Sequence, residues 1–107
     1  MVRQVRVALV TGGIGGIGTA ICQRLVRDGY RVVANHLPAE QEQADAWRRV
    51  RAGEGLEMDT IAGDVSSYED SARMIREAKG RHGAVDILVN CAGITRDKTF
   101  KKMDPSH

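Results

Sequence analysis

Aromatic residues and proline are scarce in this sequence. Of its 107 residues, one is Trp, two are Tyr, one is Phe and two are Pro. So little proline, together with 42% hydrophobic and 28% charged residues, excludes a proline-rich linker or a disordered low-complexity chain. Because aromatics are few and 12 residues are Gly, the core must consist mostly of Val, Ile, Leu and Ala around tight turns. This composition favours an α/β sheet.

Cysteines at metal-ligand spacing are also missing. Cys22 and Cys91 lie far apart, form no Cys-x-x-Cys pair and have no histidine at a ligand interval. This pattern excludes a zinc site and a disulfide framework. We therefore expect no metal site, and a reducing compartment suits the protein best.

Long hydrophobic runs and long runs of one charge are absent as well. The N-terminal segment MVRQVRVALV is too short to span a bilayer and has no small-residue cleavage site. Lys and Arg number 16 against 14 Asp and Glu, a net charge of +2 without a basic tract. We expect a soluble, cytoplasmic protein that binds neither membrane nor nucleic acid.

Short apolar runs alternate with amphipathic segments along the chain. The apolar runs predict strands at residues 5–10, 31–34, 56–62 and 85–89. The segments between them predict helices from the first glycines to Asp28, from Pro38 to Gly53 or Gly55, and from Ser66 or Ser67 onward. Either serine can cap the third helix, with an acid three positions later completing a capping box. The order β-α-β-α-β-α-β predicts a parallel sheet with helices on both faces.

A glycine-rich turn joins the first strand to the first helix, Thr11-Gly12-Gly13-Ile14-Gly15-Gly16-Ile17-Gly18. Glycines permit a tight turn, close approach of backbone N–H groups to a pyrophosphate, and close packing of helix on strand. The N-terminus of the following helix stabilises the anion. A purely structural turn is the alternative, but the position between a buried strand and an amphipathic helix predicts dinucleotide binding by a Rossmann-type, doubly wound α/β sheet.

The end of the second strand bears on the choice of dinucleotide. An Asp or Glu there would bind both ribose hydroxyls and favour NAD. The strand instead runs into Asn35 and His36, so no acid repels a 2′-phosphate at that point. This favours NADPH, although both residues could also be ordinary polar residues of a loop.

Three separated motifs resemble the short-chain dehydrogenase/reductase family over the whole chain. They are Thr11-Gly12-x-x-x-Gly16-x-Gly18 in the first turn, Asp64-Val65 after the third strand, and Asn90-x-Ala92-Gly93 after the fourth. The stretches TGGIGGIGTAICQRL and VDILVNCAGITRD are especially similar to family members that reduce acetoacetyl-CoA in polyhydroxybutyrate synthesis. The branch that reduces 3-oxoacyl-acyl-carrier protein is next in similarity. The resemblance implies NADPH-dependent reduction of a 3-ketoacyl-CoA to the (R)-3-hydroxyacyl-CoA.

The resemblance also assigns roles to residues. It places glycines at the diphosphate, Asp64 at the adenine amine, and the segment from Asn90 beside ribose and nicotinamide. Asp97 is expected near the substrate; the alternative is that its carboxylate only caps a backbone N–H of the loop. Thr11 is expected to tie the first turn to the loop after the fourth strand, and Cys91, where the family commonly has Asn, to be a packing residue. With Asn35 and His36 at the end of the second strand included, the expected cofactor-binding residues are Gly12, Gly15, Gly16, Ile17, Gly18, Asn35, His36, Gly63, Asp64, Val65, Asn90, Ala92, Gly93, Ile94 and Thr95.

Catalytic residues are not expected within these 107 residues. The family uses a Tyr followed four residues later by a Lys, with a Ser orienting the carbonyl. The residues four positions after Tyr30 and Tyr68 are alanines. We therefore expect residues 1–107 to be the cofactor-binding N-terminal part of a single Rossmann-fold domain, a fragment whose catalytic part follows His107. The family suggests a homotetramer; a non-catalytic dinucleotide-binding module is the alternative.

Overall fold

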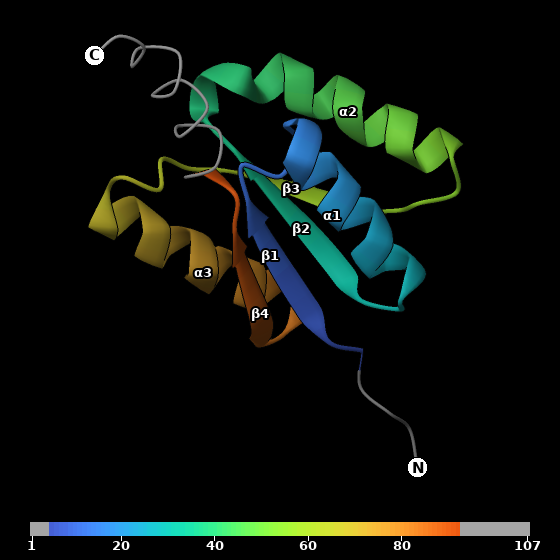
Figure 1. Ribbon diagram of the computed structural model, residues 1–107. Helices are drawn as coiled ribbons and strands as arrows, with labels where there is room; N and C mark the ends of the chain where they lie inside the picture. The colour runs from blue at the N-terminus through green and yellow to red at the C-terminus, as the bar shows by residue number, and fades with distance from the viewer. Residues whose placement is uncertain (1–4, 93–107) are drawn as a thin grey trace, which may run out of the picture.

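The computed structural model describes residues 5–92, which form one parallel sheet covered by helices on both faces (Figure 1). The elements are β1 (Val7–Thr11), α1 (Gly16–Arg27), β2 (Arg31–His36), the 3-10 helix η1 (Pro38–Glu40), α2 (Gln41–Gly53), β3 (Asp59–Ala62), α3 (Tyr68–His82) and β4 (Val85–Asn90). The predicted alternation of strands and helices is confirmed.

The strands lie in the order β3-β2-β1-β4, and every neighbouring pair is parallel. Helices α1 and α2 cover one face of the sheet, and α3 covers the other (Figure 1). This is the predicted Rossmann-type doubly wound sheet. Strands β2 and β3 are added on one side of β1, and β4 is added on its other side, so the order in which strands are added reverses between β1 and β4. In such sheets ligands bind beyond the carboxyl ends of the strands at this point of reversal.

Two apolar layers hold the sheet between its helices. Every residue of β1 is buried, because successive side chains of a central parallel strand face the two helical layers in turn. Val10 packs with Cys22 of α1, whereas its neighbour Leu9 packs with Met74 of α3. The central strands are thereby packed on both faces.

Helix α2 is joined to α1 by a hydrogen bond. The indole Nε1 of Trp47 donates to Oγ1 of Thr19 at 2.8 Å. The guanidinium of Arg51 lies 5.6 Å from the centre of the Trp47 ring and pairs with Glu54 at 3.2 Å. The bond to Thr19 joins the two helices, whereas the contacts of Arg51 lie within α2 and its C-cap.

The third strand is shorter than the apolar run predicts. Leu56 and Met58 are buried against the α1 and α2 layer, but only Asp59–Ala62 pairs with β2. The predicted strand at 56–62 is therefore wrong in its first residues. Leu56 and Met58 pack on the core before the chain joins the sheet at Asp59.

The start of α3 also differs in one detail. Ser67 caps the helix as expected, its Oγ accepting from the N–H of Asp70 at 3.1 Å. The capping box is not completed, because the N–H of Ser67 already donates to the carbonyl of Asp64. The Asp70 carboxylate accepts instead from the N–H of Asp64 at 2.6 Å.

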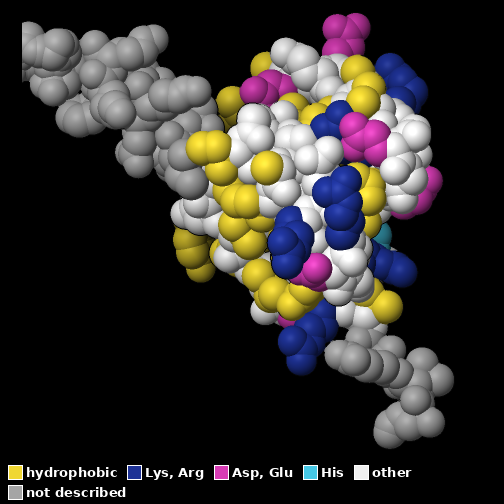
Figure 2. Space-filling model, turned by 45° about the vertical axis from the view of Figure 1, so that its right-hand side comes forward, with side chains coloured by type: hydrophobic (Ala, Val, Ile, Leu, Met, Phe, Trp, Pro, Cys, Tyr) yellow, Lys and Arg dark blue, Asp and Glu magenta, His cyan; other side chains and the backbone are white. Residues whose placement is uncertain are grey.

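The surface carries charges of both signs. On the face seen in Figure 2, Lys and Arg side chains lie among acidic and hydrophobic ones and do not form one continuous basic surface. Within residues 5–92, no helix is long and apolar enough to cross a membrane.

Candidate functional site

The turn after β1 depends on glycine at two points. Gly12 has a φ of +62°, in the left-handed region, and a Cβ added there would lie 3.1 Å from the backbone N of Ala92. A Cβ at Gly18 would lie 2.3 Å from the carbonyl oxygen of Gly12. Gly12 therefore lets the turn approach the chain after β4, and Gly18 lets α1 pack directly on the turn.

The N-terminus of α1 is suited to an anion. Within this helix no side chain caps the first turn, and the first turn contains no acid. A Cβ added at Gly16 would meet no protein atom within 4 Å. Backbone N–H groups and the positive end of the helix dipole thus face open space, which fits a diphosphate.

Thr11 joins the ends of β1 and β4. Its Oγ1 donates to Oδ1 of Asn90 at 2.9 Å and accepts from the N–H of Cys91 at 3.1 Å. The expected tie between the first turn and the loop after the fourth strand is confirmed.

Asn35 and His36 are neither exposed nor in a loop. Both belong to β2, and their side chains are 3% and 2% exposed. Oδ1 of Asn35 accepts from the N–H of Gly12 at 3.1 Å, and its Nδ2 donates to the carbonyl of Gly63 at 3.0 Å. Nδ1 of His36 donates to the carbonyl of Leu37 at 2.8 Å. The alternative that both are ordinary loop polars is wrong.

The loop after β3 forms the opposite wall of the site. The N–H of Gly63 donates to the carbonyl of His36 at 2.9 Å. Gly63 also lies close against α3, since a Cβ there would come within 2.4 Å of Sδ of Met74. Oδ1 of Asp64 accepts from both the N–H and the hydroxyl of Ser66, at 2.9 and 2.7 Å, which fixes the direction of the carboxylate.

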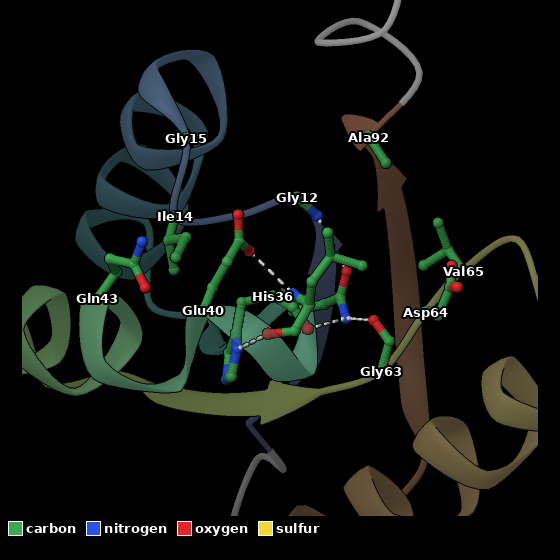
Figure 3. A pocket seen from close by; sticks show the side chains of 12 residues that line it. Gly12, Ile14, Gly15, His36, Glu40, Gln43, Gly63, Asp64, Val65 and Ala92 are labelled. Atoms are coloured by element: carbon green, nitrogen blue, oxygen red, sulfur yellow. Dashed lines mark hydrogen bonds between the residues drawn. The ribbon is translucent and has the colours of Figure 1, made fainter.

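These segments enclose a pocket of about 510 Å³ beyond the carboxyl ends of the strands (Figure 3). Its volume is in the range of small-molecule and cofactor sites. Its lining contains the following residues expected to bind the cofactor: Gly12, Gly15, Asn35, His36, Gly63, Asp64, Val65 and Ala92.

Other expected residues lie beside the pocket or outside the described residues. Gly16, Ile17 and Gly18 form the first turn of α1, where the side chain of Ile17 is 52% exposed. Asn90 lines a neighbouring cavity of about 190 Å³ together with Thr11 and Val65. Outside the described residues are Gly93, Ile94, Thr95 and Asp97.

Four further residues line the pocket without having been expected there: Ile14, Leu37, Glu40 and Gln43. Glu40 matters most, because its carboxylate brings an acid to the end of β2, where the sequence predicts none. Oε1 of Glu40 accepts from the N–H of Leu37 at 2.9 Å. Pro38 in the first turn of η1, followed two residues later by Glu, is the helix-start signal that could have revealed this fold-back.

The cysteines lie in the core near this site. Burial raises the pKa of Cys22 to about 12, with a further contribution from Cys91, and burial also raises the pKa of Cys91. Both thiols therefore stay protonated at neutral pH, which agrees with a packing role for Cys91. No three His, Cys, Asp or Glu side chains in the described part of the chain are placed to hold a metal ion.

Comparison with curated proteins finds close relatives over almost the whole chain. Acetoacetyl-CoA reductase of Allochromatium vinosum is 61% identical over 102 residues, and Nodulation protein G of Azospirillum brasilense is 50% identical over 99. These alignments include 95% and 92% of this chain but only 42% and 40% of those proteins. The chain thus spans less than half the length of these relatives.

Solved structures and a family model also match this chain. An actinorhodin polyketide ketoreductase variant solved with NADPH superposes with a TM-score of 0.73 at 34% identity, over 80% of this chain and 32% of that one. A blue fluorescent protein from a metagenomic library, in complex with NADPH, gives a TM-score of 0.69 at 29% identity, over 79% and 35%. The family model described as short chain dehydrogenase matches residues 6–107. The chain therefore belongs to the short-chain dehydrogenase family.

Proposed function

We propose that the protein takes part in NADPH-dependent reduction of a 3-ketoacyl-CoA, acetoacetyl-CoA in particular, to the (R)-3-hydroxyacyl-CoA, as in polyhydroxybutyrate synthesis. The 61% identity with the acetoacetyl-CoA reductase of Allochromatium vinosum supports the substrate. The pocket between the glycine-rich turn and the loop after β3 is the observation that carries the proposal, because its chemistry fits a dinucleotide.

The pocket residues divide between the parts of the cofactor. The backbone of Gly12 and Gly15 and the open N-terminus of α1 would hold the diphosphate. Asp64 and Val65 would hold the adenine, with the carboxylate accepting from its amine. When bound, the dinucleotide supplies a hydride for the ketone carbon. Structures of similar proteins with NADPH support this form of the cofactor.

The remaining expectations about the whole protein are part of the same proposal. Residues 1–107 would be the N-terminal part of a single cofactor-binding domain, and Asn90 with the segment after it would lie beside the nicotinamide. Asp97 would contact the substrate. The catalytic Ser, Tyr and Lys of the family would be supplied outside these 107 residues. A cytoplasmic homotetramer is the proposed assembly.

The test uses the protein at its natural length. Oxidation of NADPH is followed with acetoacetyl-CoA and, separately, with an acetoacetyl thioester of acyl-carrier protein. Faster turnover of the CoA ester supports the proposal. Faster turnover of the carrier-protein thioester would replace it with a 3-oxoacyl-acyl-carrier-protein reductase. NADPH binding without turnover of either thioester would indicate a non-catalytic dinucleotide-binding module.

A further inference from the structure

Glu40 is the one anionic side chain that reaches the pocket from the side of η1 and α2. Figure 3 shows it extending into the pocket on the same side as Ile14 and Gln43, opposite Asp64 and Val65. Its Oε1 is held by the N–H of Leu37 at 2.9 Å. The carboxylate is therefore fixed beside the end of β2 and does not extend freely into solvent.

The described lining offers no cation to balance this charge. Glu40 and Asp64 are its acidic members, and none of its 12 residues is Lys or Arg. His36 is 2% exposed, and its Nδ1 already donates to the carbonyl of Leu37. A negatively charged group at this end of the pocket would therefore be repelled by Glu40, and the described lining supplies no Lys or Arg to offset the repulsion.

The two forms of the cofactor differ in such a group. The adenosine ribose lies beside the end of β2 in dinucleotide-binding sheets, and an acid roughly 20 residues after the glycine motif accepts from its hydroxyls. Glu40 has this sequence distance from the turn, although it reaches the strand end from η1. A 2′-phosphate would replace a hydroxyl with up to about two negative charges. It would also compete with Glu40 for the N–H of Leu37.

We propose that Glu40 is a specificity-determining residue whose carboxylate keeps the preference for NADPH over NADH narrow. The inference rests on the proposed dinucleotide site. Replacement of Glu40 by Gln isolates the effect of charge, because an amide oxygen can still accept from the N–H of Leu37 and from a ribose hydroxyl.

The experiment measures dissociation constants of NADPH and NADH by nucleotide fluorescence, with wild-type protein and the Glu40→Gln variant at natural length. We expect the Kd of NADPH to fall about tenfold and that of NADH to change less than about twofold, since only the 2′-phosphate was repelled. Glu42→Gln is the matched control: it removes one charge from the exposed first turn of α2, outside the pocket lining, and should leave both constants unchanged.

A second variant separates charge from local structure. Glu40→Ala removes the charge and also the acceptor for Leu37, and it should still strengthen NADPH binding relative to NADH. An unchanged ratio of the two constants in both variants would overturn the role of Glu40. An equal change in Glu42→Gln would assign the effect to general surface charge. Wild-type protein that binds neither nucleotide would instead refute the dinucleotide site itself.

Discussion

Oδ1 of Asn35 accepts a hydrogen bond from the N–H of Gly12 at 3.1 Å, while Nδ2 of the same side chain donates to the carbonyl of Gly63 at 3.0 Å. One amide on β2 thus connects the turn after β1 with the loop after β3. The side chain is only 3% exposed, so water cannot replace either bond. Asn35 sets the spacing between two walls of the pocket.

Asn35→Ala should therefore weaken both the fold and the site. The substitution leaves the half-buried N–H of Gly12 and the buried carbonyl of Gly63 without this partner, at a cost of about 2 kcal/mol in the free energy of unfolding. Urea denaturation measures this cost, and dinucleotide affinity should fall as the two walls separate. Gln41→Ala, on the exposed start of α2, is the control and should cost less than about 0.5 kcal/mol. Equal costs would show that the Asn35 bridge contributes little.

Gly16→Val tests the position of the diphosphate. A side chain there meets no protein atom near its Cβ, so we expect the unfolding free energy to change by less than about 1 kcal/mol. The side chain would, however, fill the space in front of the α1 N-terminus. Binding of NADPH, measured by calorimetry, should weaken at least tenfold, roughly the effect of losing 1.4 kcal/mol.

Gly80→Val provides the comparison for that experiment. Gly80 lies within α3, outside the lining of the described pocket, and a Cβ there also meets nothing within 4 Å. It should leave nucleotide affinity unchanged. Retention of normal affinity by Gly16→Val would place the phosphates elsewhere.

Asp59 should give the protein a part of its acid sensitivity. Burial alone would raise the pKa of this carboxyl, but hydrogen bonds from His82, Arg81 and the N–H of Thr60 lower it below its ordinary value of 3.8. A lowered pKa in the folded state stabilises the protein above the unfolded value, and this stability is lost as pH falls through the folded pKa.

Asp59→Asn removes this contribution. We expect the variant to unfold more easily at neutral pH by about 1 kcal/mol or less, because the ion pair with Arg81 is partly exposed. The difference from wild type should vanish in strong acid, where Asp59 of the folded protein is protonated. Denaturation curves across this pH range measure it, and a constant difference would contradict the assignment.

Cys22 and Cys91 should resist thiol reagents while the protein is folded. Both are buried, and burial raises the pKa of each thiol. Labelling by iodoacetamide at pH close to 8 should be slow in native protein and rapid after denaturation. Counting labelled residues by mass spectrometry tests this, and rapid native labelling of Cys91 would indicate that the end of β4 opens.

The parts of the site that follow local rules could be predicted from the sequence. The turn from Gly12 to Gly18 is recognisable because its backbone requires glycine. The apolar strand before it places the turn at the carboxyl end of β1. Asp64 and Val65 were expected at the pocket from the resemblance to the family, and both line it.

The parts that depend on how segments fold against one another could not be predicted. Asn35 follows the apolar residues within β2, but the sequence does not say that its amide turns inward to reach Gly12 and Gly63. Glu40 lies outside the strand and reaches the pocket only because η1 folds back on Leu37. Similarly, Asp70 has the right spacing for a capping box, but the N–H of Ser67 has another partner.

The bond between Trp47 and Thr19 makes the cofactor site optically observable. Trp47 is the only tryptophan of the 107 residues, and its indole is held between α1, which begins at the glycine-rich turn, and α2, which carries Gln43. Any opening of these helices would change the polarity around the indole and shift its emission. A reduced nicotinamide absorbs where tryptophan emits, so energy transfer from Trp47 would report occupancy of the pocket without an added label.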